Sequence, residues 1–260
     1  MCLLVVAFQL FEDAPLLIGA NRDELLNRPA VSMTVLRPEA PRVLGGQDQQ
    51  SGGTWLAINE WGVFAGLTNQ PREDGRDSSR RTRGELPLAL TTQADARSCV
   101  DEFLAHHDAS DYNGCWLLAG DRGALYFIDF TGLVEAKAEP LPPGLYVLEN
   151  RPLGAPSPKA ARVTTSLADI EDAETALTEF RRVLGDHTKA EPEGPKGPKG
   201  PKSSSNCVHL EGYGTRSSCI ITCDTDVTSS PHIWVADGPP CTEPFVDVSA
   251  LWATELSSPL

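Results

Sequence analysis

The chain begins MCLLVVAFQLFEDAPLLIGANRDE over residues 1–24, and this stretch decides the fold. Two apolar runs, Cys2–Phe11 and Leu16–Ala20, are separated by a short segment with two acidic residues and a proline, a pattern typical of a β-hairpin with a tight turn. Two antiparallel strands of similar length return the chain to its start. We therefore expect the polar tetrapeptide Asn21–Glu24, at the end of the second strand, to form a functional rim close to Cys2.

Similar patterns continue along the chain, with strands first, then helices, then strands. This order favours an α+β fold with largely antiparallel sheets. Glycine-rich Val43–Gly46 and Ser51–Gly53 are interpreted as turns. The pattern predicts hairpins at Thr54–Asn59 with Val63–Thr68 and Cys115–Ala119 with Ala124–Phe130, helices at Glu85–Leu90, Ala96–His106 and Ala173–Leu184, and strands at Leu145–Leu148, Cys219–Thr222 and His232–Val235.

Residues 188–206 differ in composition from the rest of the chain. They contain Gly-Pro-Lys three times, at Gly194–Lys202, followed by three serines. A collagen helix needs many such triplets and three chains, so we interpret the segment as a disordered surface insertion. Because strands on both sides of the helical section must pair, residues 1–260 are expected to form a single domain.

Charge and cysteine content indicate which partners and which compartment to expect. Lys and Arg number 22 against 36 Asp and Glu, a net charge of −14, which argues against nucleic acid and anionic membrane surfaces as partners. No apolar run approaches the roughly 18 residues of a membrane-spanning helix, and Leu3–Leu10 lacks the basic start and cleavage site of a signal peptide. The seven cysteines, an odd number, favour a reducing compartment, so we expect a cytoplasmic protein; a homo-oligomer is left open.

Cys2 is the first candidate catalytic residue, because it follows the initiator Met directly. Removal of Met1 would leave a cysteine with a free α-amine, whose pKa of about 7.7–8.0 suits a general base. Nucleophile and base would then sit on one residue, as in enzymes with an N-terminal threonine nucleophile. The alternative interpretation of Cys2 is a buried apolar cysteine.

Nearby polar residues supply the groups that such a nucleophile needs. Asp23 is placed to orient the amine, and Arg22 to bind an anionic substrate group. Asn69 and Asn150, each at a predicted strand end, are candidate donors to an oxyanion, although Asn at such a position is also a common turn residue.

These residues carry a resemblance to a known family. Met1-Cys2, the NRDE tetrapeptide followed by Arg28-Pro29, Gly52–Leu56 and Leu67–Asn69 resemble the NRDE family, also called the Transport and Golgi organisation 2 family. Tyr213–Ser218 is similar to its C-terminal motif, and Asn150 and Pro158-Lys159 stand where the family has an Asn and a Pro-Lys. The resemblance covers about residues 1–165 and 211–245, and the Gly-Pro-Lys segment departs from it as an insertion.

The resemblance implies an N-terminal-nucleophile (Ntn) hydrolase-like αββα sandwich, with two mainly antiparallel sheets between helical layers. The segment Asn59–Gly62 with Ala65–Leu67 is also similar to the choloylglycine hydrolase and penicillin V acylase group. By that similarity Cys2 is the nucleophile and Asp23 holds its amine. Where that group has an Arg three residues before the Asp, this chain has Ala20, and Arg22 is the substitute to consider. The other implied catalytic residues are Asn69, Asn150 and Arg216.

The sequence therefore predicts an Ntn-type cysteine hydrolase that cleaves a C–N amide bond of a small substrate through a Cys2 acyl-enzyme. An acidic chain with arginines near the proposed site favours an anionic substrate group. The basic residues expected at the site are Arg22, Arg28, Arg80, Arg81, Arg83 and Arg216. The expected substrate-binding residues are Arg22, Asn21, Glu24, Trp55 and Arg81.

Two alternatives remain. The first is a non-catalytic binding or trafficking protein of the same family that handles haem or lipid, and the second is an N-terminal-cysteine amidotransferase that releases ammonia from glutamine. Cys207-x-His209, Cys219-x3-Cys223 and Cys241 offer zinc ligands, but their spacings match no standard finger. We therefore expect neither a metal nor a cofactor.

Overall fold

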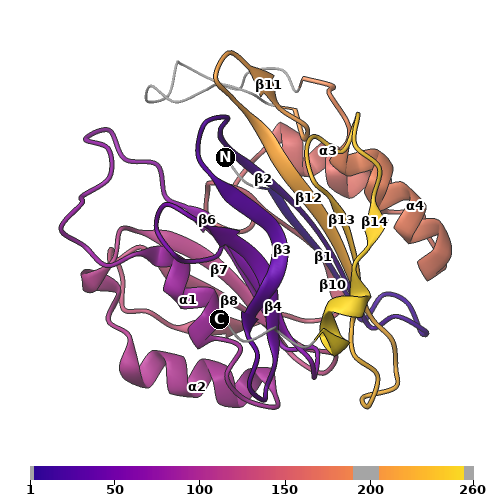
Figure 1. The fold of residues 1–260 in the computed structure, drawn as a ribbon, viewed down its shortest axis with the longest axis horizontal. Coiled ribbons are helices and arrows are strands. Elements are labelled where there is room, and N and C mark those ends of the chain that lie inside the picture. Colours follow the sequence, from indigo (N-terminus) through magenta and orange to yellow (C-terminus); the bar gives the residue numbers. More distant parts are fainter. Residues whose placement is uncertain (1–2, 190–204, 255–260) are drawn as a thin grey trace, which may run out of the picture.

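A computed structural model describes residues 3–189 and 205–254 as two antiparallel sheets (Figure 1). The first sheet has the strand order β10-β1-β2-β12-β13-β14, and β11 pairs with β12. Its strands are β1 (Leu3–Phe8), β2 (Leu16–Leu25), β10 (Gly144–Leu148), β11 (His209–Leu210), β12 (Tyr213–Cys223), β13 (His232–Ala236) and β14 (Val246–Asp247).

The second sheet follows the chain without a crossover, in the order β3-β4-β5-β6-β7-β8-β9. Its strands are β3 (Ala30–Arg37), β4 (Val43–Asp48), β5 (Leu56–Asn59), β6 (Phe64–Asn69), β7 (Cys115–Gly120), β8 (Leu125–Phe130) and β9 (Ala138–Pro140). The predicted hairpins are confirmed as β1–β2, β5–β6 and β7–β8 over the described residues.

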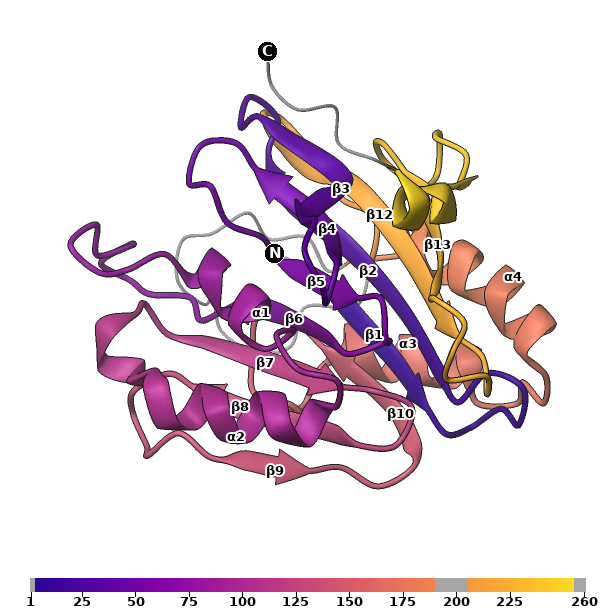
Figure 2. The same ribbon diagram turned by 60° about the horizontal axis from the view of Figure 1, so that its bottom comes forward.

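Helices cover the outer face of each sheet, as the two views of the ribbon show (Figures 1 and 2). Apolar residues of α1 and α2 pack on the second sheet, and those of α3 and α4 pack on the first. The helices are α1 (Leu86–Ala89), α2 (Ala96–His106), α3 (Pro158–Leu167) and α4 (Ala173–Leu184), with short 3-10 helices at Arg83–Glu85, Ala109–Asp111 and Ser249–Ala253. The expected αββα sandwich is confirmed.

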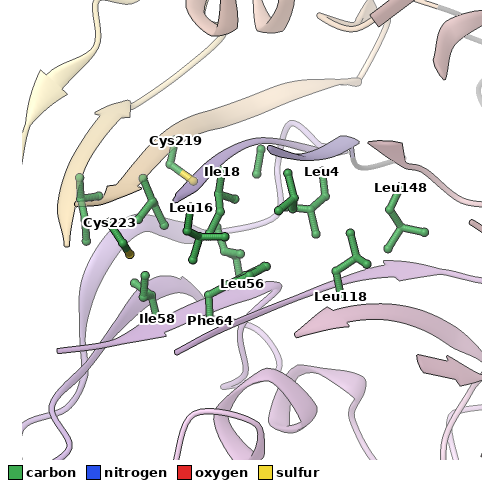
Figure 3. Packing of buried hydrophobic residues seen from close by; sticks show 14 of the residues in the cluster. Leu4, Leu16, Ile18, Leu56, Ile58, Phe64, Leu118, Leu148, Cys219 and Cys223 are labelled. Carbon is green, nitrogen blue, oxygen red and sulfur yellow. The ribbon is translucent and has the colours of Figure 1, made fainter. Parts of the chain in front are cut away.

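In each sheet, strand alternation divides the apolar side chains between the core that lies between the sheets and the core under the covering helices. In β1, Leu4 and Val6 enter the core between the sheets, whereas Leu3 and Val5 pack against α3 and α4. Figure 3 shows the core between the sheets, where Cys219 and Cys223 of β12 are buried among leucine and isoleucine side chains. Burial raises the pKa of each of these two thiols to about 12, which keeps them protonated.

Two local expectations were wrong, and one helix was not predicted. Asn21–Glu24 lies inside β2 instead of after it, because β12 pairs with this part of the strand. Val43–Gly46 belongs to β4 and is no turn; a Cβ on Gly46 would lie 2.0 Å from the Trp55 ring, so glycine lets the indole pack on the strand. Helix α3 was not predicted at all, although Ser157 caps its first turn.

Most of the predicted insertion, residues 190–204, lies outside the described residues. Its last two residues, Ser205 and Asn206, are buried. Within residues 3–189 and 205–254, no helix combines the length and the apolar character needed to cross a membrane.

Candidate functional site

The candidate site is built on β2, between β1 on one side and β12 on the other. Asn21 is the partner of Leu3 in β1, and Asp23 is the partner of Thr215 in β12. Cys2, the predicted nucleophile, lies outside the described residues, but it directly precedes Leu3 in the chain. The register of β1 and β2 therefore brings the described start of the chain beside the NRDE tetrapeptide.

An open cleft of about 110 Å³ lies beside this strand. Five of the predicted site residues line it, namely Arg22, Asp23, Glu24, Trp55 and Asn69, the last at the end of β6. The remaining lining residues are Arg28, Asp48, Ser51, Gly53, Thr54, Leu67, Arg76, Thr82, Arg83 and Gly84. Four arginines thus face three carboxylates in a protein whose net charge is −14, so the cleft is positive relative to the whole.

Asp48 organises the charges on the cleft side of β2. Its carboxylate accepts from Arg28 Nε at 2.6 Å and Arg22 Nη2 at 3.3 Å. The Arg22 guanidinium also lies 4.5 Å from the centre of the Trp55 ring. Burial alone would raise the pKa of Asp48, but the hydrogen bonds from Arg28 and the Ser51 amide outweigh it and hold this pKa below its ordinary value.

Asp23 has a different environment. Its carboxylate accepts a hydrogen bond of 2.6 Å from the Thr215 hydroxyl, and its side chain is 4% exposed. Burial raises the pKa of Asp23, and the positive charge of Lys159 and the hydrogen bond from Thr215 offset only part of that increase. Lys159, in the first turn of α3, is itself buried, and its ammonium group makes no hydrogen bond with any described residue.

Asn21 has a structural position instead of the expected place in the cleft. Its amide nitrogen donates to the carbonyl oxygens of Leu184 and Asn206, both at 2.9 Å. The amide of Asn206 in turn donates to the Val183 carbonyl at 2.8 Å. These bonds fasten β2 to the C-terminal end of α4 and to the chain that enters β11.

The other predicted residues do not line the cleft. The Asn150 amide donates to the backbone oxygen of Asn69 at 2.6 Å, so it supports that strand end without lining the cleft. Arg216 lies at the bulge of β12 and donates to the Leu26 carbonyl. Arg81 is paired with Glu85 at 2.5 Å, and neither Arg81 nor Arg216 lines the cleft. Arg80, also expected there, donates to the Tyr112 carbonyl at 2.6 Å.

Sequence reasoning missed Asp48 and Lys159 as members of the site. Asp48 ends a strand that was interpreted as a turn, and its meeting with Arg22 depends on how the sheets stack. Lys159 had a signal, because it stands in the Pro158-Lys159 pair named in the resemblance. The cleft wall at Gly53 also required the fold, since its backbone meets Gly84 so closely that a Cβ would lie 2.6 Å from the Gly84 Cα.

Comparison with solved structures shows an Ntn-hydrolase fold. The Caenorhabditis elegans ortholog of N-acylethanolamine-hydrolyzing acid amidase matches with a TM-score of 0.57 and 13% identity, over 85% of this chain and 92% of that chain. The C2A mutant of the conjugated bile acid hydrolase from Clostridium perfringens matches with a TM-score of 0.57 and 10% identity, over 98% of this chain and 95% of that chain. At these identities the likeness shows the fold alone.

Sequence comparison identifies relatives over most of the chain. The Transport and Golgi organization protein 2 homologs of Bos taurus and Homo sapiens are 31% and 30% identical in alignments of 244 and 243 positions. Each alignment covers 81% of this chain and 83% of the relative. The family model described as Transport and Golgi organisation 2 matches residues 1–230. The chain belongs to the Transport and Golgi organisation 2 family.

Proposed function

We propose that the protein is an Ntn hydrolase that cleaves a C–N amide bond of a small substrate, with Cys2 as its nucleophile. One observation carries the proposal. The buried Asp23 carboxylate lies on the strand that pairs with the start of β1, two positions beyond the partner of Leu3. A carboxylate with a pKa raised by burial, next to a cleft, is typical of functional sites.

The chemistry follows from a cysteine whose own α-amine is the base. The neutral amine takes the thiol proton, and the thiolate sulfur attacks the carbonyl carbon of the amide. The tetrahedral oxyanion collapses as the C–N bond breaks, and the amine proton passes to the leaving nitrogen. Water then adds to the thioester, giving its proton to the amine, and the acid leaves as the thiol forms again.

Residues on and near β2 have separate roles in this chemistry. Asp23 orients the amine, and Asn69 donates to the oxyanion from the cleft wall. The positive charge of the buried Lys159 favours the ionised form of Asp23, because an opposite charge lowers the pKa of a carboxyl. Asn150 supports Asn69 through its backbone oxygen.

The cleft supports a substrate with an anionic group. Arg28, Arg76 and Arg83 line it with Arg22, so four guanidinium groups face the carboxylates of Asp23, Glu24 and Asp48. A carboxylate or phosphate matches the planar array of donors on a guanidinium. The names of the two structural relatives, an acid amidase for N-acylethanolamines and a hydrolase for conjugated bile acids, agree with an amide as the bond that is cleaved.

The test is the intact mass of the purified protein before and after incubation with a panel of amides and acyl donors. We expect the mass of a chain without Met1, and then an acyl adduct on Cys2 that turnover removes. Cys2→Ala should abolish both the adduct and turnover, whereas Cys99→Ala, a change at a buried cysteine in α2, should retain them. Full turnover by Cys2→Ala, or Met1 retained on active protein, would refute the proposal.

The family suggests a second candidate, a carrier for haem or lipid without catalysis, because the curated relatives are named for transport and Golgi organisation. The chain has five histidines, all among the described residues, and none lines the cleft. A carrier would therefore bind haem there through Cys2 or by apolar contacts. A haem titration in which the Soret shift is lost in Cys2→Ala, with no acyl adduct on the parent protein, would favour the carrier.

A further inference from the structure

Away from the cleft, four side chains that can bind a metal converge. They are His187, Cys207, His209 and Cys241, and one ligand atom from each lies within 4.8 Å of all the others. His209 Nε2 is 3.6 Å from Cys207 Sγ and 3.3 Å from Cys241 Sγ. The two sulfurs are 3.6 Å apart. The rings of His187 and His209 are also neighbours, with centroids 4.9 Å apart.

Three separate parts of the chain bring these residues together. His187 follows the end of α4, Cys207 and His209 lie at the entry to β11, and Cys241 lies between β13 and β14. Cys207 and His209 are two positions apart, and in an extended chain such residues point to the same side. The Cys207 amide donates to the Asp186 carbonyl at 2.9 Å, which holds the two histidine-bearing segments together.

The distances among Cys207, His209 and Cys241 fit one metal ion. Zinc in structural sites is tetrahedral, with Zn–S near 2.3 Å and Zn–N near 2.0–2.1 Å, so its ligand atoms are about 3.3–3.8 Å apart. The three separations among Cys207, His209 and Cys241 lie in this range, and the His187 ligand atom lies within 4.8 Å of each of them. A disulfide between Cys207 and Cys241 would need its sulfurs at about 2.05 Å, much closer than they are.

We propose that His187, Cys207, His209 and Cys241 form a Cys2His2 site for a structural zinc ion. Four protein ligands close the coordination shell, so the ion would stabilise the fold and take no part in hydrolysis. No metal was expected, because the spacings of the cysteines and of His209 match no standard finger. The fold buries Cys219 and Cys223 in the core and brings His187 to the other three ligands. This proposal is independent of the proposed hydrolase activity.

The zinc ion would connect the two ends of the Gly-Pro-Lys insertion. His187 precedes residues 190–204 and Cys207 follows them, and Cys241 ties both to the C-terminal part of the chain. Asn206, next to Cys207, accepts a hydrogen bond from Asn21 of β2. A metal at this position would therefore hold the residue to which Asn21 bonds, and so support β2, the strand that carries the candidate site.

The experiment uses the full chain, purified under reducing conditions without an affinity tag, with metal content measured by mass spectrometry. We expect one zinc per chain. After chelation, cobalt(II) should restore the metal and produce the visible bands and thiolate charge-transfer absorption of a tetrahedral site with sulfur ligands. Chelation of the parent protein should also lower its melting temperature.

Cys241→Ser and His187→Ala change exposed residues, so these variants should fold. Each should weaken zinc binding by more than the ~10- to 100-fold that loss of an outer-shell partner costs. Cys99→Ala and His106→Ala, matched changes in α2, should bind metal like the parent. A reduced parent protein that retains no zinc or cobalt, equal binding by Cys241→Ser, or a Cys207–Cys241 disulfide in protein kept reduced would overturn the proposal.

Discussion

Asp23 and Asp48 are both carboxylates beside β2, but their environments differ. Asp48 is held by two arginines and backbone amides, and its pKa is below the ordinary value. Asp23 is more deeply buried, accepts from Thr215, and has a raised pKa. Both residues line one cleft, but the negative charge is stabilised at Asp48, on β4 of the second sheet, and penalised at Asp23, on β2 of the first sheet.

This difference supports a structural role for Asp48 and the proposed catalytic role for Asp23. A carboxylate matched with guanidinium groups contributes to folding, whereas a buried carboxylate that is costly to ionise is retained for what it does. We therefore assign Asp48 to the structure of the cleft and Asp23 to the proposed chemistry. Four predictions test this assignment, from the largest expected effect to the smallest.

Asp23→Asn should lower kcat on the order of 10²-fold or more, because the amide cannot hold a protonated amine as a carboxylate does. The same change should leave the free energy of unfolding at pH 7 equal or higher, because it removes a buried charge whose pKa is raised. Turnover rates and urea unfolding measure the two effects. Unchanged kcat in a folded Asp23→Asn protein would remove Asp23 from the mechanism.

Asp48→Asn should lower stability more than it lowers kcat. We expect it to destabilise the protein by about 2 kcal/mol, since the largely buried guanidinium of Arg22 loses its ion pair with Asp48. Its kcat should change less than that of Asp23→Asn. Chemical unfolding at pH 7 gives the measurement, with Asp101→Asn, in an exposed pair with Arg97, as the control expected to shift stability by less than ~0.5 kcal/mol. If Asp48→Asn unfolds like Asp101→Asn, the structural assignment of Asp48 fails.

Arg22→Lys should raise KM for an anionic substrate roughly 10-fold with little change in kcat, because a lysine cannot reproduce the planar contacts to Asp48, Trp55 and a substrate anion. Steady-state kinetics on matched anionic and neutral amides measure this effect. Arg97→Lys, at an exposed position in α2, is the control. An equal rise in KM for the neutral amide would mean that Arg22 shapes the cleft without binding the anion.

The two carboxylates should also change the acid dependence of the free energy of unfolding in opposite directions. The pKa of Asp48 is lowered from 3.8, so its contribution is complete above that value and is lost as pH falls through the lower folded pKa. The pKa of Asp23 is raised, so its cost at neutral pH disappears as pH falls through the raised value. Asp48→Asn should flatten the loss of stability in acid, and Asp23→Asn should steepen it. Parallel curves for the two variants would contradict the comparison.

Patterns that are local in sequence predicted much of the fold. Helices Ala96–His106 and Ala173–Leu184 have the predicted bounds, because one apolar face and clear ends are enough to specify them. The β1–β2 hairpin was also found from its two apolar runs. Helix α3 was missed although Ser157 and Pro158 mark its start. Only three of its ten residues are buried, and one of these three is a lysine, so its apolar face is weak.

The candidate site was harder to predict, because its contacts join residues far apart in the chain. Asp23 and Trp55 were identified from their motifs, and both line the cleft. Asn21 was placed among the substrate-binding residues, yet it bonds to Leu184 and Asn206, more than 160 residues away. A local sequence pattern cannot indicate a contact between residues so far apart in the chain.

The sequence by itself determined the hairpin, the α+β class and the residues that carry the proposed chemistry, since these follow from periodicity and from the order of residues in the motif. Only the tertiary structure decided what each of those residues meets. Side chains alternate along a strand, so the sequence separates Asn21 and Asp23 from Arg22. The second sheet packs on one face of the first sheet and brings Asp48 to Arg22. Helices α3 and α4 pack on the other face and bring the buried Lys159 near Asp23.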